Sequence, residues 1–169
     1  TFHLQKDVKF HDGTALDAQA VKWNYDRYMD AKSGSFRRSE LVPPLERIEV
    51  MDDQTIRFYL ASPFRPLLAL LATERAGHLA SPTAVQKLNS YADLNGEFGR
   101  RPVGSGPFKV KEWVPGSYLV LDRNDGYWEK GKPYLDRIVV HHINDPNAML
   151  AAMRTGRLDI VDLIDTQVE

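Results

Sequence analysis

Two glycines flank Ser105 in the stretch RPVGSGPFKV, residues 101–110, a pattern that could carry phosphate binding or a nucleophile. A dinucleotide-binding loop needs a third glycine at position 109 with a helix behind it, whereas Lys109 stands there in a strand-like run. A phosphate loop would end in Gly-Lys-Ser/Thr and a nucleophile elbow has the form G-x-S-x-G, and neither pattern is met. We therefore predict that residues 103–108 form a close-packed turn or hinge without chemistry of its own.

The histidines suggest acid–base catalysis or metal binding. His11 and Asp12 could form an acid–base pair, but Gly13 follows them directly, which is typical of a turn. His141 and His142 are neighbours in a strand-like run, so their imidazoles face opposite sides and cannot hold one ion together. The absence of cysteine excludes disulfides, thiolate ligands and a cysteine nucleophile. The sequence thus predicts no catalytic residue, no metal site and no cofactor.

Solute binding is the chemistry that remains. Phe36 lies in a loop of glycine and serine, where a large apolar side chain has little local reason to be, and Arg37 and Arg38 follow it. An aromatic ring beside two guanidinium groups suits stacking combined with capture of a carboxylate. The alternative is a solvated loop with one docked phenylalanine. Other aromatic residues could line a sugar or peptide groove, although packing explains each of them better: Trp113, Tyr118, Tyr127 and Trp128.

The composition limits the class of protein. The 169 residues are 43% hydrophobic and 27% charged, which is typical of a soluble globular chain of one domain or two small ones. A net charge of −1 argues against a nucleic-acid binder, which normally has a basic excess. The apolar run LLALLA at residues 67–72 is too short to span a bilayer.

The first hundred residues predict strands, helices and a hairpin. Residues 2–10 alternate between apolar and polar, as strands do. Asp17 is a natural N-cap for a helix that runs to about residue 31. LERIEVMDDQTIRFYL at residues 45–60 is typical of a hairpin with its turn at Asp52-Asp53. The helix presents one apolar face, made of Ala18, Val21, Tyr25 and Tyr28.

Short helices are expected next, and then a boundary. Prolines begin the helical segments predicted at residues 66–76 and 82–88. Residues 89–101 are polar, contain glycine and have no period, which predicts a domain boundary. We therefore expect one domain over residues 1–100 and another over residues 101–169.

The second part predicts a hairpin, a strand, a helix and a final strand. The hairpin comprises residues 107–113 and 117–123, and a third strand covers residues 134–143. Asp145 is the natural N-cap of the helix and Gly156 its C-terminal stop. The run LDIVDLI then predicts a last strand, so that strand, helix and strand would form a crossover in an α/β layer. The sequence begins within a strand-like run and stops directly after another, which predicts that the chain is a piece of a larger protein.

Five segments in a fixed order carry a family resemblance across almost the whole chain. They are TFHLQKDVKFHDGTALDAQAVKWNYDRY, DDQTIRFYLASPF, VGSGPFKVKEW, LDRNDGYWEKGKPYLDRIVV and MRTGRLDIV. Together they resemble the family 5 extracellular solute-binding proteins of bacterial ABC importers, of the dipeptide-, oligopeptide- and nickel-binding type.

The resemblance implies a fold and a place for the chain within it. The expected class is α/β, mixed α+β in this piece, as part of a type II periplasmic-binding-protein fold with an extra domain on the first lobe. Residues 1–100 would form most of that extra domain, truncated at its N-terminus. Residues 101–169, truncated at their C-terminus, would return into the first lobe, with residues 103–108 as the joint. Phe36 is the nearest match to an aromatic residue that lines the pocket of oligopeptide-binding relatives.

The resemblance also implies a function. The chain would belong to a periplasmic or otherwise extracytoplasmic receptor that is not an enzyme. It would bind a small, peptide-like solute between two lobes and deliver it to a membrane permease, without any role for nucleic acid. Two alternatives stay open: a hydrolase or metal-dependent enzyme using His11, Asp12 and the 141–142 pair, and a sensory or chaperone-like binding domain on the same fold.

Overall fold

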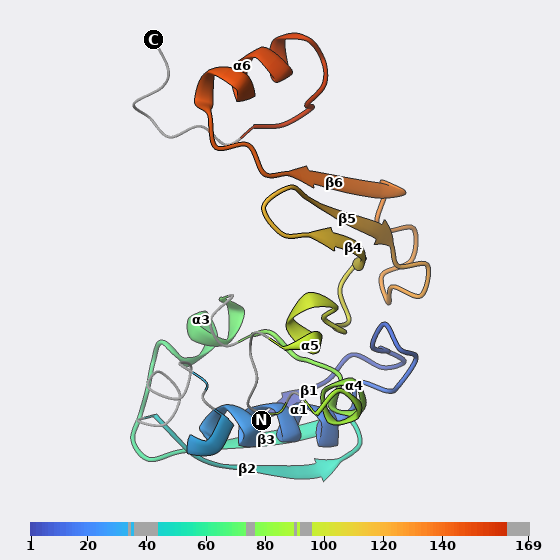
Figure 1. Ribbon diagram of the computed structural model, residues 1–169. Coiled ribbons are helices and arrows are strands. Elements are labelled where there is room, and N and C mark those ends of the chain that lie inside the picture. The colour runs from blue at the N-terminus through green and yellow to red at the C-terminus, as the bar shows by residue number, and fades with distance from the viewer. Residues whose placement is uncertain (34, 36–43, 74–76, 90, 92–95, 162–169) are drawn as a thin grey trace.

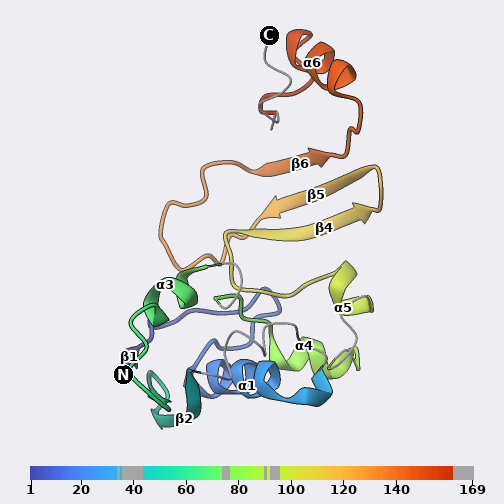
Figure 2. The ribbon, with the colours of Figure 1, turned by 90° about the vertical axis from the view of Figure 1, so that its left-hand side faces the viewer.

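Two three-stranded sheets, the first at one end of the molecule and the second between the short helices and helix α6 (Pro146–Arg154), form the framework of the protein (Figures 1 and 2). The structure is a computed structural model and describes residues 1–33, 35, 44–73, 77–89, 91 and 96–161. The first sheet and the long helix over it lie at one end, short helices lie in the middle, and the second sheet lies beyond them. This combination of helices and antiparallel sheets confirms the predicted mixed α/β class.

The first sheet has the order β1-β3-β2 and is antiparallel throughout. Its strands are β1 (Phe2–His3), β2 (Leu45–Asp52) and β3 (Thr55–Leu60), which confirms the predicted hairpin. The prediction of strands over residues 2–10 was too broad. Beyond β1, the described residues of that stretch contribute only an isolated bridge between Lys9 and Ala15.

Helix α1 (Ala18–Met29) covers this sheet and encloses the main core. The Asp17 side chain accepts a hydrogen bond from the backbone N–H of Ala20, so the predicted N-cap is confirmed. The predicted apolar face is also confirmed, because all four of its side chains are buried. They pack against the sheet residues Leu45, Ile48 and Ile56, and the ring of Phe58 meets those of Phe2 and Tyr25 edge-on.

Among the described residues, one short helix precedes β2, and three more lie between the first sheet and the second. They are η1 (Ala31–Ser33), α3 (Leu67–Ala72), α4 (Pro82–Lys87) and α5 (Glu97–Arg100). Helix α3 ends before residue 76, because the Thr73 backbone is already extended. Helix α5 lies within residues 89–101, in which the sequence shows no period, and its four residues are too few to produce a helical one.

The second sheet has the order β4-β5-β6. Its strands are β4 (Phe108–Val114), β5 (Tyr118–Arg123) and β6 (Arg137–His141), all antiparallel, as the predicted hairpin and third strand require. Gly116 at the hairpin tip has φ +74°, a conformation that favours glycine. Helix α6 (Pro146–Arg154) follows, with the predicted N-cap Asp145, and Gly156 lies just beyond its end at φ +69°.

The predicted final strand is not found among the described residues. Residues 158–161 have no strand conformation, and Ile160 is 87% exposed. The remainder of the predicted strand, residues 162–164, lies outside the described residues. The composition of residues 158–164 is typical of a strand, but a strand forms only when a neighbouring strand pairs with its backbone hydrogen-bonding groups. The predicted crossover unit is therefore absent from the described part of the chain, where both sheets are antiparallel.

Candidate functional site

Residues 103–107, between α5 and β4, are held by backbone hydrogen bonds on both sides, and we call this segment the junction. The N–H of Ser81 donates to the carbonyl of Val103 at 2.9 Å, and the N–H of His11 donates to the carbonyl of Gly104 at 2.7 Å. The N–H of Asn124 donates to the carbonyl of Pro107 at 2.8 Å. The junction is therefore fixed to the turn that contains His11, to the start of α4 and to the end of β5.

The His11 ring reinforces this attachment. Its Nε2 lies 3.0 Å from the carbonyl oxygen of Gly106, and its Nδ1 lies 3.4 Å from the backbone nitrogen of Gly104. The neighbouring Asp12 carboxylate accepts hydrogen bonds from the hydroxyls of Ser81, at 2.5 Å, and Thr14, at 2.6 Å. The turn is thus bonded to the junction through His11 and to the start of α4 through Asp12.

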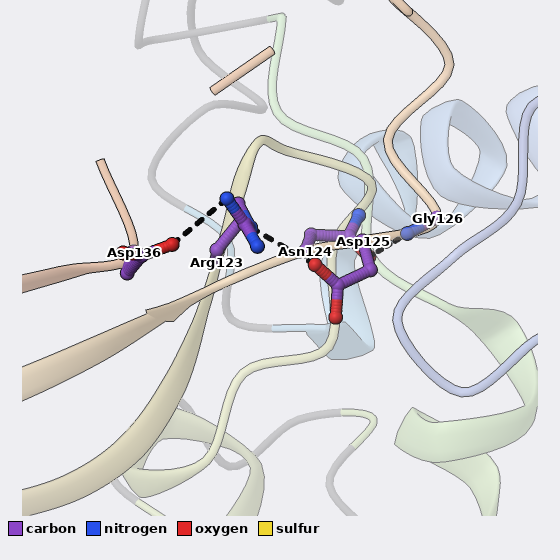
Figure 3. Close-up of polar contacts among 5 residues, drawn as sticks. All are labelled: Arg123, Asn124, Asp125, Gly126 and Asp136. Atoms are coloured by element: carbon purple, nitrogen blue, oxygen red, sulfur yellow. Dashed lines mark hydrogen bonds and ion pairs between the residues drawn. The ribbon is translucent and has the colours of Figure 1, made fainter. Parts of the chain in front are cut away.

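Asn124 holds the junction from the opposite side. Its Nδ2 donates to the same Gly106 carbonyl at 3.0 Å, while its Oδ1 accepts from the N–H of Gly126 at 3.2 Å. Only 5% of Asn124 is exposed, so both polar atoms of its buried amide have a partner in these contacts. Figure 3 shows this turn, with Arg123 reaching Asp125 and Asp136 at 2.9 and 2.8 Å. The carbonyl oxygen of Gly106 is therefore contacted by the side chains of both His11 and Asn124.

A cavity of about 540 Å³ adjoins the junction. Four segments line it: α1, the stretch before α4, α5 and the junction itself. The lining residues are Arg27, Tyr28, 77–80, Phe98, Gly99 and 102–106. Aromatic rings and backbone amides therefore share one concave surface, which is the usual composition of small-molecule sites.

Side chains of α1 fix the floor of this cavity. The buried Asn24 donates to the carbonyl of Ala80 and accepts from its N–H, both at 2.9 Å, and Tyr28 donates to the carbonyl of His78. Arg27, 7% exposed, donates from Nε to the carbonyl of Tyr91 at 2.9 Å, and its guanidinium lies 5.7 Å from the centre of that ring. The bonds of Asn24 and Tyr28 hold the residues before α4 against the helix, and the bond of Arg27 holds Tyr91, which follows α4.

The two titratable groups of the turn have shifted pKa values. Burial lowers the pKa of His11 below its ordinary 6.5, and the charge of Lys109 acts in the same direction. The hydrogen bond to Gly106 and the charge of Asp12 oppose this shift without cancelling it. Partial burial raises the pKa of Asp12, but the hydrogen bonds from Ser81 and Thr14 outweigh it, so its pKa is lowered.

The predicted site residues fall in different places. Phe36, Arg37 and Arg38 lie outside the described residues, so their role stays a prediction. His11 and Asp12 stand in a turn, as predicted, and the backbone of the junction engages both nitrogens of the His11 ring. His141 and His142 lie at the end of β6 and are exposed. In the described part of the chain, no three His, Cys, Asp or Glu side chains group to hold a metal ion.

The aromatic residues between positions 113 and 128 differ in their exposure and in their partners. Trp113 and Trp128 are each 46% exposed, and the ring of Trp128 packs against that of Tyr127 at 5.6 Å. The Tyr118 hydroxyl donates to Glu112 at 2.9 Å. Packing within this chain therefore accounts for only part of their surface. The described residues also include no helix long and apolar enough to cross a membrane.

Sequence reasoning missed the polar residues that build the cavity floor. Asn24 and Arg27 stand among apolar positions of α1, and both are buried. A polar side chain within the apolar stripe of an amphipathic helix is the signal that could have identified them, because burial obliges such a group to find a partner.

Comparisons with known proteins agree on one family. Residues 1–169 match the model of the bacterial extracellular solute-binding proteins, family 5 middle segment. The glutathione-binding protein GsiB of Shigella flexneri is 33% identical over 156 residues, which are 92% of this chain and 29% of that protein. The chain therefore spans less than a third of the length of this relative.

Solved structures agree with the sequence comparison. The periplasmic binding protein DppA from Helicobacter pylori, associated with an ABC transporter and solved with the peptide STSA, has a TM-score of 0.78 and 30% identity over 93% of this chain and 33% of its own. The oligopeptide-binding protein AppA from Bacillus subtilis, solved with a nonapeptide, has a TM-score of 0.79 and 33% identity over 92% and 30%. The predicted relation to the type II periplasmic-binding-protein fold is thus confirmed. The chain belongs to the family 5 extracellular solute-binding proteins of bacteria, whose middle segment it matches from its first residue to its last.

Proposed function

We propose that this chain is part of an extracytoplasmic receptor of a bacterial ABC importer, which binds a peptide-like solute reversibly and performs no covalent chemistry. The observation that carries the proposal is the family match over all 169 residues. The relatives support the solute class, because one is named for glutathione binding and two were solved with peptides. In this role the protein acts outside the cytoplasm and passes its solute to a membrane permease.

The cavity beside the junction is the part of the binding wall that we assign to this chain. Its volume of about 540 Å³ lies within the range of roughly 300–1,000 Å³ that small-molecule sites occupy. The half-buried Phe98 offers aromatic surface, and the junction offers backbone amides for the polar ends of a peptide. The loop with Phe36, Arg37 and Arg38 would add stacking and a carboxylate partner.

The division into residues 1–100 and 101–169 is part of the same proposal. In it, the first part is an extra domain and the second returns into the lobe that carries it. The position of the main core supports this division, because its buried residues all lie between residues 18 and 56. The junction is then a joint, and its bonds to His11, Ser81 and Asn124 set how the two parts meet.

A hydrolase or metal-dependent enzyme is the weaker candidate. Each His11 ring nitrogen already faces a backbone partner, so neither is available to activate a water or a nucleophile. A sensory or chaperone-like receptor on the same fold would use the same cavity. It would differ from an import receptor only in its partner protein.

The test is made on the full-length protein. Native mass spectrometry after gentle purification identifies any solute that is retained, and calorimetry then measures glutathione, a dipeptide and a nonapeptide. We expect one-to-one binding of at least one of them with a Kd in the micromolar range or below, about −8 kcal/mol or stronger. Turnover of a peptide, or a complete lack of binding together with esterase or phosphatase activity, would overturn the proposal. Uptake in cells lacking the protein distinguishes importer from sensor.

A further inference from the structure

The surroundings of His11 determine which ring nitrogen carries the proton. A backbone carbonyl only accepts, so the Nε2 that faces the Gly106 oxygen must be the donor. A backbone N–H only donates, so the Nδ1 that faces the Gly104 nitrogen must be the acceptor. Both contacts together require a neutral ring protonated at Nε2. This assignment follows from the partners alone.

We propose that His11 is a pH-dependent latch on the junction. In its neutral form the ring holds Gly104 through Nδ1 and Gly106 through Nε2. When Nδ1 takes up a proton from solvent, it becomes a second donor and can no longer accept the Gly104 N–H. The Gly106 contact survives protonation, so the latch opens at one point of the junction and not at both.

The charged groups around the ring favour the closed latch. Burial disfavours a positive charge on the ring, and the charge of Lys109, near the start of β4, acts in the same direction on the pKa of His11. Asp12 favours protonation, but its carboxylate is already engaged by Ser81 and Thr14. From the end of β5 the ring's neighbour is Asn124, which shares the Gly106 carbonyl and carries no charge.

The sign of the pH effect follows from the lowered pKa of His11. Above the ordinary value of 6.5 the ring is neutral whether the latch is closed or open, so the closed form is fully stable. As the pH falls below 6.5, a released ring takes up a proton at a higher pH than a latched ring does. The population of the open form therefore increases. The latch therefore weakens on acidification, over the window between 6.5 and the lowered pKa of His11.

The latch bears on the candidate site, because residues 102–106 line the cavity. Opening it would loosen one wall of the cavity while Asn24 still holds the floor. Where the proposed function holds, on which this consequence rests, acidification would weaken solute binding through His11. The latch itself can be measured without any solute.

The test is NMR of the full-length protein, without solute, between about pH 8 and pH 5. We expect the His11 ring to be the Nε2-protonated tautomer at the upper end and to titrate below 6.5. The backbone amide of Gly104 should shift with the same midpoint, and its hydrogen-exchange protection should fall by up to roughly tenfold for each pKa unit that separates the latched and released rings.

Two variants make the result specific. In His11→Gln the side-chain amide can still donate to Gly106 but does not titrate, so the pH dependence at Gly104 should disappear while the fold is retained. The exposed His142 provides the matched control, since His142→Gln should leave the Gly104 titration unchanged. An Nδ1-protonated tautomer, a His11 midpoint at or above 6.5, or a Gly104 titration that persists in His11→Gln would each overturn the latch.

A second arm separates the latch from the proposed function. The affinity for the retained solute is measured at both ends of the pH range in the unaltered protein and in His11→Gln. We expect the acid-induced loss of affinity to be larger in the unaltered protein. If no solute binds at any pH, the proposed function fails while the NMR result still decides the latch. If the solute binds with the same pH dependence in both proteins, the latch does not regulate the site.

Discussion

At the residue scale, Gly104 and Gly106 contribute to the junction through their backbone groups. The sequence indicated that Gly104 and Gly106 permit tight backbone turns. Neither has a positive φ, a Cβ at Gly106 would meet nothing within 4 Å, and one at Gly104 would make only ordinary contacts. Their carbonyls, not their missing side chains, are what the junction uses.

Gly77, which lines the cavity, is sterically required. A Cβ there would lie 2.4 Å from the carbonyl oxygen of Leu71 and 3.0 Å from that of Thr73, and both obstacles are backbone. We expect Gly77→Ala to lower the free energy of unfolding by about 1–3 kcal/mol. Gly106→Ala is the matched control and should leave stability unchanged or raise it by up to about 1 kcal/mol. Thermal unfolding of both variants decides the point, and equal melting temperatures would contradict it.

Phe36 is the residue whose predicted role most needs a direct measurement. If its ring stacks on the solute, Phe36→Ala in the full-length protein should weaken binding by about 1 kcal/mol, measured by calorimetry. Met51, an exposed apolar side chain at the end of the first hairpin, provides the control, and Met51→Ala should leave the affinity unchanged. An unaltered affinity in the Phe36 variant would instead favour the solvated loop.

At the element scale, a feature could be predicted from the sequence when the residues that cause it are close together in the chain. The N-caps Asp17 and Asp145 were predictable because each bonds backbone amides two or three residues away. The hairpins were predictable from alternation and turn chemistry. The strand expected at residues 158–164 was not, because its formation depends on a neighbouring strand that a local pattern does not reveal. The cavity likewise draws on segments as far apart as α1 and the junction.

Asn24 is the clearest case of an element held by one buried polar group. It bonds the carbonyl and the N–H of Ala80, so Asn24→Leu would leave two backbone groups without partners. We expect a loss of about 2–4 kcal/mol in the free energy of unfolding, measured by urea denaturation. Gln19, on the exposed side of α1, gives the control, since Gln19→Leu should change stability by less than about 0.5 kcal/mol. A similar, small effect in both variants would show that Asn24 does not fix the cavity floor.

At the scale of the whole molecule, apolar surface is distributed unevenly. The buried hydrophobic side chains of the described residues all lie between residues 10 and 85, whereas most of the exposed large ones lie between residues 113 and 160. Trp113, Leu119 and Val140 stand in register across β4, β5 and β6, and therefore share one face of the second sheet. Trp113 is 46% and Val140 49% exposed. The second sheet thus presents an apolar face that no described part of this chain covers.

That unevenness leads to a prediction about the isolated chain. The chain spans 29% of GsiB and 33% of DppA, and in the proposed function it supplies only part of one wall of the solute site. A solute enclosed between two lobes takes contacts from both walls, and closure removes water from its polar groups. The isolated chain should therefore bind the solute of the intact protein at least about a hundredfold more weakly, a loss of roughly 3 kcal/mol or more.

Calorimetry with the same solute on the isolated chain and on the full-length protein measures this difference. Circular dichroism and one-dimensional NMR must first show that the isolated chain is folded, so that a loss of affinity is not a loss of structure. The core under α1 makes folding of the first part expected, since its helix, sheet and aromatic cluster all lie within that part. Full affinity in the isolated chain would place the whole site within these residues and would contradict a cleft between two lobes. A folded chain with a hundredfold weaker affinity would instead locate the missing contacts in the other lobe.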